Sequence, residues 1–393
     1  TCGGGIMSNW PLGIVSSANF SSGFQLWFWG AGTSGFFGDG TVTPNKSSPV
    51  QSNFVEPISW ERNSGQDKVS TGDNNMFVIV GGAMFVWGVN TTNGSLGLGD
   101  KVNRSSPVQL GSDTDWEYIA AGRESNISIK GGGLYSWGFN TQGQLGQGDV
   151  VKRSVPTQIG SATNWTKCFV GRYNGAAINS DGELYVWGLN SAGQLGQNDV
   201  VSRSTPVQIA GTTWNSAAFG GQAALYTKTD GTLFCVGSNE QGLFGTGVLE
   251  RDASDNHVLR SVVVQVGSET DWVDVRMSPE ASVIALKGNG TIWCWGNGNK
   301  GAMGQGTAIN YSAPVQVGSD SDWTSISAGK ASRTAFAVRA GIAYAWGDQN
   351  IYGGLGIGIV TDQSVPIVIA GGFEDWVYVE SCDNSSFGLR TGS

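Results

Sequence analysis

Residues 116–160 hold one complete repeat of the chain, and this repeat determines the predicted fold. They read WEYIAAGRESNISIKGGGLYSWGFNTQGQLGQGDVVKRSVPTQIG. Four short runs within them, WEYIAAG, SNISIKGGG, LYSWGFN and VPTQIG, are apolar or alternating and are bounded by Gly, Asn, Asp and Ser. Such runs are typical of β-strands joined by turns, and no long stretch has the 3.6-residue period of a helix. The segment therefore predicts four short antiparallel strands and very little helix.

Two sets of tryptophans extend this repeat in both directions along the chain. The first set precedes a glycine at intervals of 49 to 59 residues and comprises Trp29, Trp87, Trp137, Trp187, Trp295 and Trp346, with Val236 in the remaining place. The second set alternates with the first and comprises Trp60, Trp116, Trp165, Trp214, Trp272, Trp323 and Trp376. Seven places in each set indicate seven repeats. The predicted fold is an all-β, seven-bladed β-propeller with four antiparallel strands per blade. We expect a tryptophan in each inner strand to wedge between neighbouring blades.

The two ends of the chain carry complementary halves of one repeat. Residues 24–40 match the second half, and residues 377–393 match the first half. Pairing of the N- and C-terminal strands would complete the seventh blade and hide the sheet edges that an open array exposes. We therefore predict a single propeller over residues 23–393 and an N-terminal extension over residues 1–22. Whether Cys2 of the extension pairs with Cys382 is left open.

Composition excludes several classes of function. Charged residues are 13% of the 393 residues, the net charge is −9, and no more than two Lys or Arg are adjacent. This pattern argues against a nucleic-acid partner. No apolar run approaches the roughly 20 residues of a membrane helix, so we expect no membrane insertion. His257 is the only histidine, which excludes a multi-histidine metal site. We therefore predict no enzyme activity, no catalytic residues, no metal site and no cofactor.

Two groups of acidic residues invite a binding interpretation. The motifs GSDTDW, GSETDW and GSDSDW precede three tryptophans of the second set, but they lack the alternating oxygen ligands of a calcium loop. We interpret them as turns in which Asp accepts backbone hydrogen bonds. Asp100, Asp149 and Asp199 each lie four residues before an arginine. We favour local ion pairs there, and the alternative is a basic rim for an acidic partner, formed by Lys46, Arg104, Arg153, Arg203 and Arg260.

The motifs GQLGQGD (residues 143–149) and RSVPTQI (residues 153–159) occur again in related form at 193–199 and 203–209. They resemble the regulator of chromosome condensation repeat family, and the similarity extends over residues 24–393. The resemblance implies seven blades of four strands but no single activity. Members of that family include a nucleotide exchange factor for a small GTPase, a plant ultraviolet-B receptor, a secreted β-lactamase inhibitor and many phage and bacterial proteins. The low charge and the abundance of Ser, Thr, Asn and Gly are similar to the phage and bacterial members.

The resemblance also supplies two tests of activity. The histidine that the exchange factor carries after its first strand has no counterpart, because the equivalent positions hold Asn75, Ser125, Asn174, Ala223, Ala281, Ser332 and Ser385. The receptor's GWRHT motif is also absent. We therefore expect neither exchange activity nor ultraviolet reception.

Partner recognition is expected where the chain departs from the repeat, because loops at the rim tolerate insertions. One insertion lies within residues 60–68, and the other lies within residues 248–260. The candidate partner-binding residues in them are Arg62, Lys68, Glu250, Arg251, Asp252, Asp255, His257 and Arg260.

The hypothesis is a non-enzymatic recognition or structural propeller. It would be a virion or cell-surface component that binds a protein or glycan partner, with a homo- or hetero-oligomer in the assembly as a further option. The alternative is a soluble protein-binding scaffold or enzyme inhibitor, located in the cytoplasm.

Overall fold

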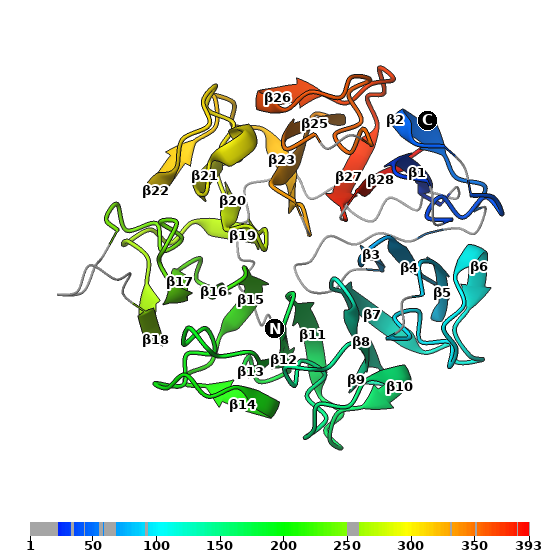
Figure 1. Ribbon diagram of the computed structural model, residues 1–393. Helices are drawn as coiled ribbons and strands as arrows, with labels where there is room; N and C mark the ends of the chain where they lie inside the picture. Colours follow the sequence, from blue (N-terminus) through cyan, green and yellow to red (C-terminus); the bar gives the residue numbers. More distant parts are fainter. Residues whose placement is uncertain are drawn as a thin grey trace, which may run out of the picture.

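The computed structural model describes residues 23–32, 35–42, 44–54, 58, 68–90, 93–249, 259–330, 332–349, 352–382 and 384–392. Seven four-stranded sheets, each antiparallel throughout, stand around a central channel (Figure 1). The seven-bladed all-β propeller predicted from the repeats is therefore confirmed. One short 3-10 helix, η1 (Asn299–Gly301), is present in the described residues.

Each blade contributes four strands, which are numbered here from the channel outward. Blade 1 has β27 (Trp376–Ser381), β28 (Ser385–Arg390), β1 (Gln25–Gly30) and β2 (Lys46–Gln51). Blade 2 has β3 (Val69–Thr71), β4 (Asn75–Val80), β5 (Ala83–Gly88) and β6 (Arg104–Gln109). Blade 3 has β7 (Trp116–Ala121), β8 (Ser125–Lys130), β9 (Gly133–Gly138) and β10 (Arg153–Gln158). Blade 4 has β11 (Trp165–Val170), β12 (Asn174–Asn179), β13 (Leu184–Gly188) and β14 (Arg203–Ile209).

The remaining three blades follow the same order. Blade 5 has β15 (Trp214–Phe219), β16 (Ala223–Lys228), β17 (Leu233–Ser238) and β18 (Leu259–Gln265). Blade 6 has β19 (Trp272–Met277), β20 (Ser282–Lys287), β21 (Ile292–Gly296) and β22 (Tyr311–Gln316). Blade 7 has β23 (Trp323–Ala328), β24 (Thr334–Arg339), β25 (Ile342–Gly347) and β26 (Gln363–Val368).

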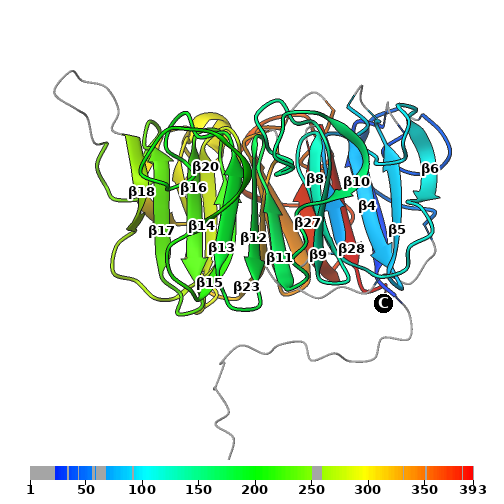
Figure 2. The ribbon, with the colours of Figure 1, turned by 90° about the horizontal axis from the view of Figure 1, so that it is seen from below.

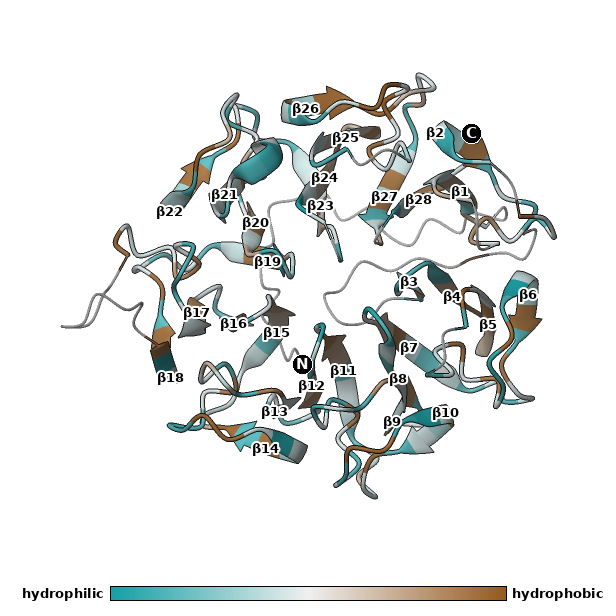
Figure 3. Cartoon of the chain, in the orientation of Figure 1, coloured by the Kyte–Doolittle hydropathy of each residue, from teal (hydrophilic) through white to brown (hydrophobic). Residues whose placement is uncertain are grey.

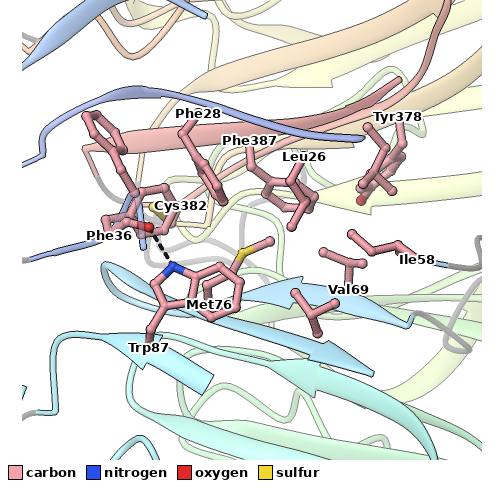
Figure 4. Packing of buried hydrophobic residues seen from close by; sticks show 13 residues of the cluster. Leu26, Phe28, Phe36, Ile58, Val69, Met76, Trp87, Tyr378, Cys382 and Phe387 are labelled. Atoms are coloured by element: carbon pink, nitrogen blue, oxygen red, sulfur yellow. Dashed lines mark hydrogen bonds between the residues drawn. The ribbon is translucent and has the colours of Figure 1, made fainter. Parts of the chain in front are cut away.

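Blade 1 closes the ring with strands from both ends of the chain, as the sequence predicts. Strand β1 pairs antiparallel with β28 from Gln25↔Arg390 to Gly30↔Ser385 without a break in register. Between blades 1 and 2 lies an apolar cluster that includes Phe28, Met76 and Trp87 (Figure 4). The extension over residues 1–22, and with it the question of a Cys2–Cys382 pair, lies outside the described residues.

The two sets of tryptophans lie in different strands of the blades. The second set begins the innermost strand of blades 1 and 3–7, as expected, whereas the Trp-Gly set lies in the third strand and all six of its tryptophans are fully buried. Each indole Nε1 donates a hydrogen bond to a backbone carbonyl in the loop of the preceding blade, at 2.8–3.0 Å. Trp187, for example, donates to the carbonyl of Gln144. These hydrogen bonds tie adjacent blades together in register.

Blade 5 keeps this link although Val236 stands in the place of the tryptophan. Tyr226 on the adjacent strand β16 is fully buried, and its hydroxyl donates to the carbonyl of Gln194 at 3.2 Å. Gln194 is the repeat equivalent of Gln144. Burial raises the pKa of Tyr226 well above its usual value, so the hydroxyl remains a donor. In the other blades the third strand carries the large buried residue, a tryptophan. In blade 5 the third strand carries the smaller Val236, and the second strand carries the large Tyr226 instead.

The two ends of the propeller carry different connections (Figure 2). The first strand runs to one end and the second returns, so the loops joining strands 1 and 2 and those joining strands 3 and 4 share one end. We call this end the loop face. The turns joining strands 2 and 3 and the links between blades occupy the other end, the turn face. In the GQLGQGD loops Gly146 has φ +70°, and a Cβ there would lie 3.0 Å from the Trp187 Nε1 atom. Glycine is thus required where this loop passes over the indole.

Candidate functional site: the loop face

Exposed aliphatic side chains form a ring on the loop face. They lie in the outer loops, which join strands 3 and 4, and every blade contributes at least one (brown stretches in Figure 3). Their exposed fractions range from 47% to 65%. The members are Val42, Val102, Val150, Val151, Val200, Val201, Val248, Leu249, Ile309, Ile359 and Val360. A contiguous array of exposed apolar groups is the usual mark of an interaction site on a folded protein.

Ion pairs hold the outer loops of blades 2, 3 and 4 in one conformation. In blade 3, Arg153 Nη2 lies 2.7 Å from Asp149 Oδ2, while Asp149 Oδ1 accepts the backbone N–H of Val151 at 2.9 Å. Arg153 Nη1 also donates to the carbonyl of Val151 at 2.7 Å. Blades 2 and 4 repeat this arrangement with Asp100–Arg104 and Asp199–Arg203, both at 2.5 Å. The aliphatic residues are therefore presented to solvent by a loop whose backbone is fixed.

These contacts confirm local pairing in preference to a basic rim. The pKa of Asp149 is lowered by Arg153 and by the backbone N–H of Val151. The pKa values of Asp100 and Asp199 are lowered in the same way, by the backbone N–H of the valine two residues later and by the paired arginine. Three of the five cations proposed for the rim are thus committed to neighbouring carboxylates. Because these groups are largely exposed, each pair stabilises the fold only weakly.

The inner loops surround one opening of the channel, and their charges are largely paired as well. Arg333 Nη2 lies 2.9 Å from Glu280 Oε2, and Arg123 Nε lies 3.4 Å from Asp73 Oδ2. The Arg172 guanidinium packs over the ring of Tyr173 at 5.1 Å. The inner ring is therefore polar and internally balanced, in contrast to the aliphatic outer ring.

Lys330 crosses the channel from blade 7 and joins three other blades. Its Nζ donates to the carbonyls of Thr71 and Ala121 at 2.6 and 2.9 Å, and it forms an ion pair with Glu380. Glu380, which is 3% exposed, also accepts hydrogen bonds from Thr71 and Tyr378. These charged and polar groups bond to one another, so the arrangement joins blade 7 to blades 1, 2 and 3 next to the blade that closes the ring. Opposite them the channel wall is apolar, with Phe169, Phe219 and Met277.

The acidic motifs before the second tryptophan set have a different role from the one expected. They lie on the turn face, where Asp113 pairs with Lys130 at 2.6 Å and Glu269 pairs with Lys287 at 2.8 Å. Asp322 lies 3.5 Å from Arg339 in the same arrangement. Within the described ranges no group of three or more His, Cys, Asp or Glu could hold a metal ion. The carboxylates of these motifs thus pair with a neighbouring cation, and the absence of a metal site stays a prediction.

The partner-binding residues predicted from the insertions are mostly not placed by the structure. Outside the described residues lie Arg62, Glu250, Arg251, Asp252, Asp255 and His257. Lys68 donates to the carbonyl of Glu117 at 2.6 Å and packs over Tyr118, so it links blades 2 and 3. Arg260 packs over the ring of Phe244. The role of the two insertions in partner binding therefore stays a prediction, as does the absence of enzyme activity and cofactors.

The aliphatic ring was missed in the sequence, although its signal is present. Each outer loop carries one or two Val, Leu or Ile shortly after its glycine-rich turn, as in Asp149-Val150-Val151. Apolar residues are usually assigned to the core unless their exposure is known. In the part of the chain that the structure describes, no helix has the length and hydropathy needed to cross a bilayer.

The fold and the loop face define the class of protein: a seven-bladed β-propeller with exposed aliphatic side chains in the outer loops of every blade on one face. Repeats of one known family are matched in four stretches of the chain. The Regulator of chromosome condensation (RCC1) repeat matches residues 81–129, 131–178, 181–225 and 289–333, and a second form of it matches residues 166–194.

Two curated proteins are similar in sequence. Ultraviolet-B receptor UVR8 of Arabidopsis thaliana is 27% identical over 354 residues, which are 88% of this chain and 66% of the receptor. Probable E3 ubiquitin-protein ligase HERC3 of Homo sapiens is 32% identical over 124 residues, or 30% of this chain and 11% of the ligase. The chain thus spans 66% and 11% of the lengths of these two relatives.

Solved structures share the whole fold. Human WBSCR16 has a TM-score of 0.77 at 19% identity, covering 94% of this chain and 99% of that one. Prp20p of Saccharomyces cerevisiae has a TM-score of 0.78 at 18% identity, covering 94% and 92%. These proteins are all eukaryotic, so the comparisons do not support the expected phage or bacterial type, nor the virion or cell-surface role expected with it.

Proposed function

We propose that this chain is a protein-binding scaffold without enzyme activity, which recognises its partner through the loop face. The observation that carries the proposal is the ring of exposed aliphatic side chains in the outer loops of all seven blades. The ion pairs that fix these loops in blades 2, 3 and 4 reduce the entropy lost on binding, since that part of the contact surface is ordered beforehand. The proposal replaces the surface-component hypothesis with its protein-scaffold alternative, and a cytoplasmic location is part of it.

The fold comparison lends support of a general kind. The structure of Prp20p is described together with its binding properties to Gsp1p and histones, so a propeller of this shape serves protein recognition elsewhere. Residues at the position of the exchange-factor histidine, such as Asn75 and Asn174, are buried here and bond to their own blade. We therefore propose binding without nucleotide exchange. An assay of nucleotide release from small GTPases tests that part separately.

The central test compares two matched substitutions of exposed valines. The double variant Val151→Asp/Val201→Asp alters the loop face, while Val155→Asp/Val262→Asp alters the outer wall at similar exposure. Partners captured by the wild-type chain should be lost with the first variant and retained with the second. For a purified partner, titration calorimetry should show Kd raised at least about tenfold by the loop-face change, because each buried valine contributes about 1.5–3 kcal/mol. Equal binding by both variants would contradict the proposal.

A further inference from the structure

A cation packed between aromatic rings recurs on the turn face. It is the last residue of the second strand in each case, and it lies directly opposite a second-set tryptophan in the strand register. Lys287, for example, lies 4.6 and 4.7 Å from the ring centroids of Trp272 and Trp293. Equivalent cations are Lys130 in blade 3, Lys228 in blade 5, Arg339 in blade 7 and Arg390 in blade 1.

Blade 4 has the aromatic pair but lacks the cation. Trp165 and Tyr185 meet edge-to-face with ring centroids 5.2 Å apart, like the pairs in the other blades. The residue opposite Trp165 is Asn179, whose side chain ends well short of a lysine ammonium. No described residue places a cation over either ring. Trp165 is 8% exposed. The equivalent tryptophans that have a cation beside them are only 2–4% exposed, and they are Trp116, Trp214, Trp272, Trp323 and Trp376.

The link before blade 4 has changed together with the cation. Where blades 3, 6 and 7 have two acidic residues in this link, blade 4 has Ala162 and Asn164. Ala162 and Trp165 line a surface pocket with Ile159 and Pro206. The indole Nε1 of Trp165 has no hydrogen-bond partner among the described residues, as is also true of Trp116, Trp214, Trp272 and Trp323. The small alanine thus leaves open space beside Trp165, although Tyr185 and Glu183 do not line this pocket.

A carboxylate remains at this place to balance an incoming charge. Glu183 Oε2 accepts hydrogen bonds from Asn179 Nδ2 at 2.8 Å and from the Tyr185 hydroxyl at 3.1 Å. These two donors hold the pKa of Glu183 below its usual range, so it is ionised at neutral pH. The nearest cation on the strand, Lys167, is bonded to Asn215 of blade 5 at 2.6 Å. Blade 4 therefore offers two aromatic rings and one carboxylate to a cation that the chain itself does not provide there.

We propose that this slot of blade 4, formed by Trp165, Tyr185 and Glu183, binds a lysine or arginine side chain of a protein partner. The incoming cation takes the place that Lys130, Lys228 and Lys287 occupy in their own blades. The site lies on the turn face, so it goes beyond the loop-face function and can succeed or fail independently of it. A single side chain held in this way gives millimolar affinity alone and acts as an anchor within a larger contact.

The test uses small probes and the indole N–H signal of Trp165, assigned by its loss in Trp165→Phe. The full chain is titrated with Nα-acetyl-lysine amide, with Nα-acetyl-arginine amide, and with the uncharged Nα-acetyl-norleucine amide. We expect saturable shifts of the Trp165 signal with the two cations and none with norleucine. Equal shifts with norleucine, or no shift with either cation, would overturn the proposal.

Two substitutions separate binding from a purely structural role. Asn179→Lys supplies the missing cation internally, so it should abolish the probe-induced shift and raise Tm by roughly 1–2 °C. The matched control Thr141→Lys adds the same charge on the exposed loop face and should leave the shift unchanged. Glu183→Gln should weaken the binding of both cations several-fold while the fold is retained. Persistence of the shift in Asn179→Lys would show that the probes bind elsewhere.

Discussion

The two faces of the propeller use their charged residues in opposite ways. On the turn face, cations lie between aromatic rings and cover them, as Lys287 does at 7% side-chain exposure between Trp272 and Trp293. On the loop face, arginines hold the loop backbone and leave aliphatic side chains in water, as Arg153 does for Val151. Charged residues on the turn face therefore shield aromatic rings from solvent. Those on the loop face fix the loops and leave aliphatic side chains available for contact. Three changes test this difference.

The largest effect is expected for Lys287→Ala on the turn face. The substitution removes a desolvated cation from two indoles and also removes ion pairs with Glu269 and Asp271. Cation–π contacts in such a setting contribute about 2 kcal/mol. We expect the free energy of unfolding, measured by urea denaturation, to fall by about that amount. Lys152→Ala, where an exposed lysine packs over Phe139 alone, serves as the control and should change it much less. Equal losses of unfolding free energy in the two variants would contradict the proposed difference between a buried cation and an exposed one.

A smaller effect is expected for Arg153→Ala on the loop face. The ion pair with Asp149 is partly exposed, so its removal should lower the free energy of unfolding by less than about 1 kcal/mol. Its main consequence should be faster motion of residues 149–152, since the hydrogen bond from Arg153 to the Val151 carbonyl disappears and Asp149 loses its arginine partner. Backbone NMR relaxation of Val151 measures this, with Val201 in blade 4 as the unchanged reference. A large loss of stability would show that this pair supports the blade and not only the loop.

The smallest effect is a pH dependence of the same loops. The pKa values of Asp100, Asp149 and Asp199 lie below 3.8, mainly because the carboxylates accept backbone N–H groups and pair with arginines. A lowered folded-state pKa means that the stabilisation is present above the ordinary Asp pKa and is lost as pH falls through the lower folded value. The amide signals of Val102, Val151 and Val201 should therefore titrate with midpoints below 3.8. Asp149→Asn should abolish the change at Val151 only.

The repeat pattern predicted the architecture well because it depends on residues that occur in every blade. Seven blades, four strands, closure by both ends and the Asp–Arg pairs all follow from spacing and are confirmed. The position of the Trp-Gly tryptophans in the third strand did not follow, because strand order from the channel is a property of the assembled sheet. Tyr226 was not identified either, since it compensates for Val236 from a different strand.

The candidate sites were harder to predict than the fold. Recognition was sought in the charged insertions, whereas the ring of exposed valines lies in regular repeat positions. Sequence alone does not show which apolar residues remain exposed, because burial depends on neighbours from other blades. The blade 4 slot is visible only as a set of missing groups: Asn179, Ala162 and Asn164 become informative once the cations of blades 1, 3, 5, 6 and 7 have been located.

Closure of blade 1 also has a consequence for biosynthesis. Strand β1 (Gln25–Gly30) is synthesised long before β28 (Ser385–Arg390), yet each is the other's neighbour in the sheet. During synthesis the edge of β1 that pairs with β28 stays unpaired until β28 has left the ribosome. Such long-range pairing slows folding and prolongs exposure to aggregation. We therefore expect chaperones to protect the nascent chain until β28 emerges.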